Sequence, residues 1–198
     1  MVAVAEAYAA LDEGLRSWGE LPDAELANAH AIFRPRRVPA RTLLQRAGEP
    51  VEHVWFIVRG LTRMYYVAEG GAERTKGFRA EGELVCSYAS ALRGAPSRQF
   101  IETLEPTELL VAHQPAFARL RARHPAWATV LGAMTERLFL DEERRHRALL
   151  TQDAAARYHA FVTERPALAA RLTQRQIAAY VGVAPETLSR IRAETPTV

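Results

Sequence analysis

Cysteine is almost absent from this sequence: Cys86 is the only one among 198 residues. A lone cysteine excludes an intramolecular disulfide, and it excludes an iron–sulfur cluster held by cysteines of one chain. We expect Cys86 to be a buried small residue, and a redox role is the alternative.

Long apolar runs are missing too. The sequence contains nothing near the run of about 18 apolar residues that a transmembrane helix needs, and its first residues carry acidic side chains without a basic leader. We therefore predict a cytoplasmic protein that has no membrane partner. Because 48% of the residues are hydrophobic, the chain can fill one large core or two modest ones.

The residue patterns of common catalytic sites are also lacking. The six histidines are scattered, and no His-x-His or His-x-Asp pair is present to begin the metal site of an oxygenase. Glu81 and Glu83 lie beside a turn signal, where carboxylates are usually solvated. Gly70-Gly71 is typical of a hairpin turn and not of a phosphate-binding loop. The sequence thus predicts no enzyme and no metal site.

Lysine occurs once, at Lys76, whereas arginine is abundant. The net charge of the chain is +3, and residues 142–198 hold nine arginines against six acidic residues, which equals the whole surplus. Arginine suits bidentate contacts to phosphate and guanine, so this distribution favours a nucleic-acid partner for the C-terminal segment. Alternatively, the high arginine content only reflects the composition of the genome.

Helical and β-type sequence patterns alternate along the chain. Residues 3–34 should form two helices, separated at Leu21-Pro22, with Asp23 capping the second. From Ile32 to Val111, short β-type runs with turns every eight to twelve residues are typical of a sandwich or barrel. The candidate strands are residues 32–38, 42–45, 53–59, 61–67, 74–79, 84–87, 99–104 and 108–112. The helical period then returns in residues 115–123, 125–150 and 153–164.

The long helix of residues 125–150 carries an apolar seam. Trp127, Leu131, Met134 and Leu138 recur at three-four spacing, and charged residues flank them, as in a dimeric coiled coil. Packing against its own domain alone is the alternative for this helix. The seam predicts a homodimer.

The stretch from Arg171 to Arg192 predicts a DNA-binding helix-turn-helix. Ile177, Ala178 and Val181 share one face of a first helix, and Gly182 supplies the permissive backbone of a sharp turn. In such a motif the second helix enters the major groove, where Glu can accept from cytosine and Arg can grip guanine. An ordinary helical hairpin is the alternative. We predict that double-stranded DNA is contacted by Thr173, Gln174, Arg175, Glu186, Thr187, Ser189, Arg190 and Arg192.

Together these features resemble the Crp/Fnr family of bacterial transcription regulators. The resemblance covers nearly the whole chain, and it is carried by residues 54–66, 81–110, 149–168 and, most specifically, 186–192 (ETLSRIR). It implies an α+β fold with an N-terminal antiparallel β-roll of the jelly-roll type, a long dimerisation helix and an all-α helix-turn-helix domain. The expected divisions are residues 1–114, 115–150 and 151–198. It also implies RNA polymerase as a partner.

In the cyclic-nucleotide-binding members that this chain resembles, a Gly-Glu pair and an Arg followed by Ser or Thr hold the ligand. Gly82 and Glu83 match the first pair. Ser97 and Arg98 stand in reversed order after a longer connection of residues 88–95, and alternation along a strand would turn Arg98 to the opposite face. We therefore expect no cofactor, and a cyclic nucleotide in a pocket of these four residues is the alternative.

The recognition helix departs from the family at one position. Pro185 stands where many members have a base-contacting Arg or Ser, and proline cannot donate a hydrogen bond to a base edge. Specificity at that base pair should be relaxed. The sequence predicts a dimeric, sequence-specific transcription regulator whose roll senses an unidentified small effector or serves as a scaffold. The alternative is a ligand-binding roll whose helical tail is a protein-interaction module.

Overall fold

The computed structural model describes residues 2–194. The chain divides into two compact units, which take their described residues from 1–65 and 77–137 in unit 1 and from 66–76 and 138–198 in unit 2. Helix α5 (Ala126–Thr151) and the hairpin of strands β4 (Thr62–Val67) and β5 (Glu73–Arg79) contribute residues to both units.

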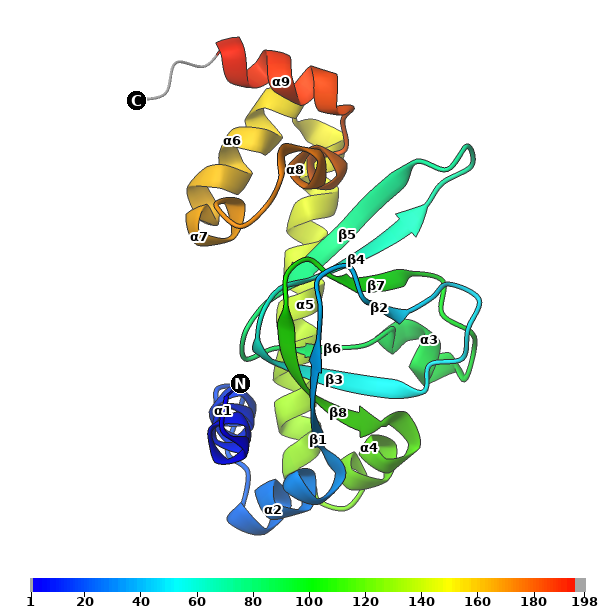
Figure 1. Ribbon diagram of the computed structural model, residues 1–198, viewed down its shortest axis with the longest axis vertical. Coiled ribbons are helices and arrows are strands. Elements are labelled where there is room, and N and C mark those ends of the chain that lie inside the picture. The colour runs from blue at the N-terminus through cyan, green and yellow to red at the C-terminus, as the bar shows by residue number, and fades with distance from the viewer. Residues whose placement is uncertain (1, 195–198) are drawn as a thin grey trace. The chain divides into compact units, whose positions relative to one another are not determined.

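Unit 1 is built on a roll of two four-stranded sheets (Figure 1). One sheet has the order β1 (Arg34–Val38), β8 (Thr107–His113), β3 (His53–Arg59) and β6 (Leu84–Val85), and the other has the order β2 (Leu43–Gln45), β7 (Phe100–Thr103), β4 and β5. The β1–β8, β3–β8, β3–β6, β2–β7 and β4–β7 pairs are antiparallel. One core cluster of the roll consists of Val38, Trp55, Ile57, Met64, Val85, Ile101 and Leu109.

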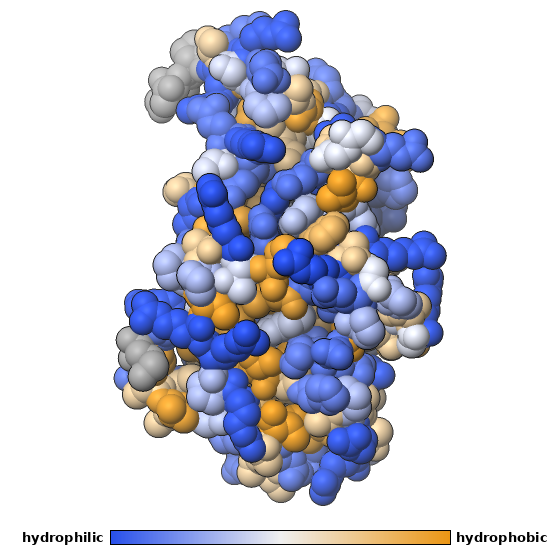
Figure 2. All heavy atoms as spheres, turned by 45° about the vertical axis from the view of Figure 1, so that its right-hand side comes forward, coloured by the Kyte–Doolittle hydropathy of each residue, from blue (hydrophilic) through white to orange (hydrophobic). Residues whose placement is uncertain are grey.

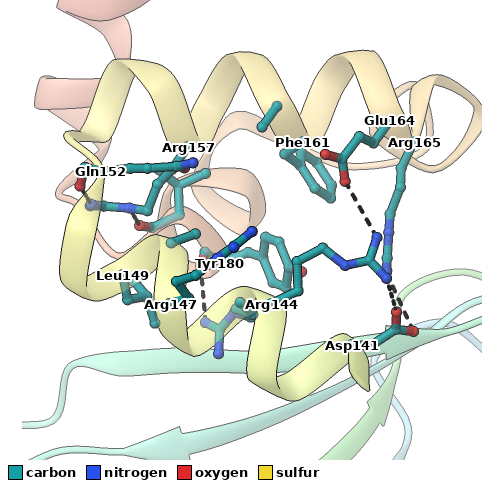
Figure 3. Close-up of a pocket in the computed structure, with 14 residues that line it drawn as sticks. Asp141, Arg144, Arg147, Leu149, Gln152, Arg157, Phe161, Glu164, Arg165 and Tyr180 are labelled. Atoms are coloured by element: carbon teal, nitrogen blue, oxygen red, sulfur yellow. Dashed lines mark hydrogen bonds and ion pairs between the residues drawn. The ribbon is translucent and has the colours of Figure 1, made fainter. Parts of the chain in front are cut away.

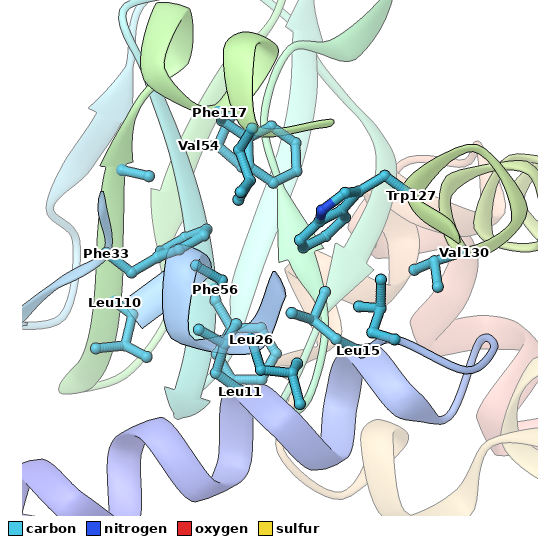
Figure 4. Packing of buried hydrophobic residues seen from close by; sticks show 14 of the residues in the cluster. Leu11, Leu15, Leu26, Phe33, Val54, Phe56, Leu110, Phe117, Trp127 and Val130 are labelled. Carbon is cyan, nitrogen blue, oxygen red and sulfur yellow. The ribbon is translucent and has the colours of Figure 1, made fainter. Parts of the chain in front are cut away.

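A second core joins the roll to the helices of unit 1 (Figure 4). Helices α1 (Val4–Arg16), α2 (Asp23–Ile32) and α4 (Gln114–Arg121) and the start of α5 contribute to it. Gly14 of α1 is needed there, because a Cβ atom at this position would lie 2.7 Å from the ring of Phe56. Trp127 is fully buried in the same core and meets Phe117 edge to face, with ring centroids 6.2 Å apart.

Unit 2 contains a small helical core. Its helices are α6 (Ala154–Glu164), α7 (Pro166–Ala169), α8 (Gln174–Val181) and α9 (Pro185–Glu194), together with the last turns of α5. Asp153 caps α6 by accepting a 2.8 Å hydrogen bond from the backbone N–H of Ala156. The buried apolar residues in its described part are Phe161, Ile177, Ala178, Val181, Leu188 and Ile191.

The first half of β5 is tied to α5 within unit 2. Lys76 Nζ lies 3.6 Å from Glu142 Oε1, and Arg145 Nη2 donates a 2.8 Å hydrogen bond to the carbonyl oxygen of Thr75. These contacts link the hairpin of residues 66–76 to the C-terminal part of α5.

The α+β class and the antiparallel roll predicted from the sequence are confirmed, and all eight strands occur within two residues of their predicted limits. The prediction that Asp23 caps the second helix is wrong: Asp23 is the first residue of α2 and Pro22 is the cap. Two short helices were not predicted. They are α3 (Tyr88–Arg93), within the connection of residues 88–95, and α7.

Hydrophilic side chains cover most of the visible face in Figure 2, and apolar residues come in small groups between them. Among residues 2–194, the large apolar side chains that are exposed are Val4, Tyr66, Val67, Leu92, Phe139, Leu140, Leu149 and Leu150. Within residues 2–194, no helix combines the length and the apolar character that crossing a membrane requires.

Candidate nucleic-acid interface and sensor site

Helix α8 begins with a complete capping box. The Thr173 hydroxyl accepts from the backbone N–H of Gln176 at 3.3 Å, and the Gln176 side chain accepts from the backbone N–H of Thr173 at 2.7 Å. Gln174 and Arg175 follow in the first turn, and both are exposed. Thr173 therefore fixes the helix start, and the Gln174 and Arg175 side chains that follow it are exposed.

Gly182 makes the turn after α8. Its φ of 87° lies in the left-handed region that favours glycine, and its N–H donates to the carbonyl oxygen of Ala178 at 2.9 Å. The N–H of Val183 donates to the same carbonyl at 3.0 Å, and Val183 is half-buried between the two helices. The turn thus closes the end of α8 and sets the start of α9.

Helix α9 has one buried face and one exposed face. Leu188 and Ile191 are buried, as the helical period predicts. Glu186, Ser189, Arg190 and Arg192 are exposed, and Thr187 is half-buried. Glu186 and Arg190 are four residues apart on the helix, which places them one turn apart on the same side. The exposed face of α9 thus offers a carboxylate acceptor and a guanidinium fork to a ligand.

The Gly82-Glu83 pair lies in the turn before β6 and is held by the protein's own backbone. Gly82 has a φ of 81°, its N–H donates to the carbonyl oxygen of Ile57 at 2.9 Å, and the N–H of Ile57 donates to the carbonyl oxygen of Glu83 at 3.0 Å. The Glu83 carboxylate accepts from the N–H of Ala80 at 2.8 Å and lies 3.8 Å from Arg79 Nε. The Glu83 carboxylate is thus oriented by the backbone of its own turn and by Arg79 at the end of β5.

Ser97 and Arg98 lie in the loop before β7 and not on a strand. Ser97 is buried, and its hydroxyl donates to the carbonyl oxygen of Gln99 at 2.8 Å, whereas Arg98 is exposed. Within residues 2–194, no hydrogen bond or ion pair joins Ser97 or Arg98 to Gly82 or Glu83. The four residues of the expected effector pocket are not linked to one another by polar contacts.

Comparisons with known proteins support the interpretation of the roll. The sequence profile of the cyclic nucleotide-binding domain matches residues 35–124. No curated protein sequence matches the chain.

Solved structures extend the similarity to both units. The c-di-GMP-responsive global regulator CLP of Xanthomonas campestris has a TM-score of 0.72 at 17% identity, over 87% of this chain and 91% of that one. FixK2 of Bradyrhizobium japonicum has a TM-score of 0.72 at 22% identity, over 82% and 84%. A putative Crp/Fnr-family transcriptional regulator of Eubacterium rectale has a TM-score of 0.76 at 16% identity, over 92% and 87%.

The chain shares the fold of the Crp/Fnr regulators, and its residues 35–124 match the profile of the cyclic nucleotide-binding domain. The family resemblance predicted from the sequence is thereby confirmed. At these identities the solved structures show the fold and leave the ligand of this domain open.

The long helix of this Crp/Fnr fold differs from the sequence interpretation in one residue. Trp127, expected on the dimer seam, is fully enclosed in the core of unit 1, and Leu131 and Met134 are partly buried against that core. Leu138 is half-buried, and its neighbours Phe139 and Leu140 are 65% and 58% exposed. Sequence reasoning missed Phe139 and Leu140, because they lie outside the three-four spacing that defined the seam.

Proposed function

We propose that this Crp/Fnr-type protein is a sequence-specific DNA-binding transcription regulator. The observation that carries the proposal is the two-faced helix α9: Leu188 and Ile191 anchor it to α6 and α8, while Glu186, Ser189 and Arg190 point away from the core. In a DNA-binding helix-turn-helix, residues near the N-terminus of the second helix contact base edges. A hydrogen-bond acceptor and a guanidinium at this place suit that role, whereas an ordinary surface helix does not need them.

The exposed residues have the chemistry for base reading. Arg190 can donate two hydrogen bonds to O6 and N7 of guanine, and Glu186 can accept one from N4 of cytosine. Because the two side chains lie one turn apart, they reach neighbouring base pairs. Pro185, at the first position of α9, cannot donate to a base edge, so the specificity at its base pair is relaxed.

Phosphate contacts fix the position of this helix on the duplex. Gln174 and Arg175 in the first turn of α8, together with Thr187 and Arg192 of α9, supply polar and cationic side chains for the DNA backbone. Thr173 contributes mainly by capping α8, so its role in binding is to hold the N–H groups of that turn in place.

The protein acts as a homodimer in this proposal. Leu138 of α5 is half-buried and its neighbours Phe139 and Leu140 are exposed, and a second copy of α5 would cover these apolar side chains. A two-fold dimer presents two copies of α9 to half-sites about one helical turn, or about 34 Å, apart. The operator is therefore palindromic.

The cyclic nucleotide-binding domain serves as a sensor of a small effector or as a scaffold. Arg98 is exposed outside a strand and has no polar contact to Gly82 or Glu83, so we expect no cyclic nucleotide at these residues. CLP, which is similar in fold, is described as a regulator that responds to c-di-GMP and links cell-cell signaling to virulence gene expression. Such a role implies RNA polymerase as a partner and a cytoplasmic location.

The test is selection of binding sites from a random DNA pool, with purified protein, with and without cyclic AMP. The proposal predicts an enriched palindrome in the arm without nucleotide. Binding that requires cyclic AMP would overturn the expectation for Glu83 and Arg98. If no sequence is enriched, a salt titration on random DNA follows, because phosphate contacts release counterions and give a steep salt dependence. An affinity for DNA that does not change with salt concentration contradicts DNA binding and favours a helical tail that contacts proteins.

A further inference from the structure

Unit 2 contains a pocket that the proposed function does not use. It has a volume of about 160 Å³ and is lined by the last turns of α5, by α6 and by the end of α8 (Figure 3). Helix α9 contributes no described residue to its lining. A buried water needs about 10–15 Å³ of such space, so the pocket has room for a small molecule with several non-hydrogen atoms.

Five arginines line this pocket, against two acidic residues. The arginines are Arg144, Arg145, Arg147, Arg157 and Arg165, and the acidic residues are Asp141 and Glu164. This lining carries three more positive than negative charges. Because the low-dielectric wall of a pocket strengthens electrostatic interactions, such a surplus attracts an anion.

The two carboxylates lie at one end of the pocket and are paired there. Arg144 donates a 2.7 Å hydrogen bond to Asp141 Oδ1 and lies 4.0 Å from Glu164 Oε2, and Arg165 lies 3.8 Å from Asp141 Oδ2. Figure 3 shows Asp141, Arg144, Glu164 and Arg165 grouped at this end. Their charges largely compensate one another, so the surplus belongs to the other three arginines.

Those three arginines have no carboxylate partner within residues 2–194. Arg157 donates to the carbonyl oxygens of Val181 at 2.9 Å and Gln152 at 2.6 Å. Arg145 donates to those of Thr75 at 2.8 Å and Tyr180 at 3.0 Å. Carbonyl groups orient a guanidinium but leave its charge in place. Arg147 is exposed and makes no side-chain hydrogen bond or ion pair with any described residue.

Arg145 adds a further sign of an incomplete site. Its Nε is fully enclosed and has no hydrogen-bond partner among residues 2–194, and its guanidinium lies 4.7 Å from the centroid of the Tyr180 ring. Leaving a buried charged group unpaired is costly, so the positive charge of Arg145 favours an anion nearby. The rings of Tyr180 and Phe161, 4.9 Å apart, form an apolar side of the same pocket.

We propose that this pocket binds a small phosphorylated anion, with Arg145, Arg147 and Arg157 as its ligands. Phosphate oxygens accept several charge-assisted hydrogen bonds at once, and arginine offers them in a planar fork. A ligand there touches both α5 and α6. The proposal does not depend on DNA binding.

The experiment is isothermal titration calorimetry of the full chain at low salt with inorganic pyrophosphate, followed by inorganic phosphate. The proposal predicts saturable binding of one pyrophosphate per chain, weaker binding of phosphate, and a loss of about tenfold in affinity for Arg147→Gln, because one charge-assisted hydrogen bond is removed. Arg147→Lys, which keeps the charge, retains part of the affinity. Arg157→Gln also weakens binding, although it removes contacts to Val181 and Gln152 as well.

Two variants serve as controls. Arg123→Gln changes the net charge equally but lies in unit 1 and is exposed, so the pyrophosphate affinity should stay unchanged. Arg190→Gln removes a guanidinium from α9 and tests whether the anion binds on the DNA-reading surface instead. No saturable binding by the unmodified protein overturns the proposal. An equal loss of pyrophosphate affinity in Arg147→Gln and in either control also overturns the proposal.

Discussion

Trp127 Nε1 donates a 2.8 Å hydrogen bond to Glu25 Oε2, and both side chains are buried although 102 residues separate them in the sequence. The bond joins the first turns of α5 to α2 and satisfies the single polar group of a ring that the core of unit 1 encloses. This contact explains why Trp127 faces its own domain and is not available to a dimer partner.

Glu25→Ala should destabilise unit 1 by about 1–3 kcal/mol, because it leaves the indole N–H of Trp127 buried without an acceptor. Urea unfolding, followed by tryptophan fluorescence, measures the free energy of unfolding. Glu20→Ala is the control, since Glu20 is exposed and should change that free energy little. Equal effects of the two substitutions would show that the Trp127–Glu25 bond contributes nothing.

Gly182→Ala should lower the stability of unit 2 by about 1–2 kcal/mol, since its φ of 87° places an L side chain in the left-handed region. The added Cβ would also lie 3.4 Å from Leu149 Cδ2. Gly132→Ala, in the interior of α5 with no atom within 4 Å of the new Cβ, should instead stabilise the helix by up to about 1 kcal/mol. Thermal unfolding of both variants measures the two shifts, and the same sign in both would contradict this account of the turn.

The stability of unit 1 should fall as the pH drops below about 6.5, in part because of His53. Burial lowers the pKa of His53 below its ordinary value of 6.5, Glu52 opposes this shift, and His113 and Arg36 add to it. The unfolded chain therefore takes up the proton at a higher pH than the folded chain, so the stabilisation is present above pH 6.5 and is lost as the pH falls through the folded pKa. His53→Gln should flatten this part of the profile.

His146→Gln is the control for that profile, since His146 is exposed on α5. Urea midpoints measured between pH 5 and pH 8 give the comparison. A His53→Gln profile as steep as that of the unmodified protein would contradict the role of His53.

Cys86 should react very slowly with iodoacetamide in the folded protein. Burial raises the pKa of its thiol to about 12, and Arg121 and Arg79 only partly oppose this. Because the thiolate is the nucleophile, alkylation at pH 8 should be much slower than in the unfolded chain, where the pKa is about 8.5. Mass spectrometry of samples alkylated with and without urea gives both rates. Comparable rates would favour the redox role that the sequence left open.

The sequence predicts most of this fold because the spacing of its apolar residues changes clearly between the helical segments and the strands. Strand β3 matches its predicted limits, since apolar residues between His53 and Arg59 lie between clear turn signals. Helix α3 was missed because six residues are too few to show a helical period. The period of α5 correctly gives a long helix, but it cannot tell which neighbour covers each face, so it assigned Trp127 to the wrong partner.

The candidate sites, too, could be predicted from the sequence only in part. The faces of α8 and α9 follow from local spacing, so Ile177 and Leu188 were correctly predicted to be buried. The arginine pocket depends on three helices that meet only in the folded unit, and nothing in the spacing of Arg147 and Arg157 reveals it. The domain limits, the dimer seam and the base-reading residues stay predictions.

The base-reading role of Arg190 is the central claim. Once an operator has been selected, fluorescence anisotropy compares the unmodified protein with Arg190→Ala on that operator, on a variant changed at one base pair, and on random DNA. The account predicts that Arg190→Ala loses about 1–3 kcal/mol on the operator, loses its preference at one base pair, and changes little on random DNA. An equal loss on the operator and on random DNA would contradict it, because Arg190 would then contact only the phosphate backbone.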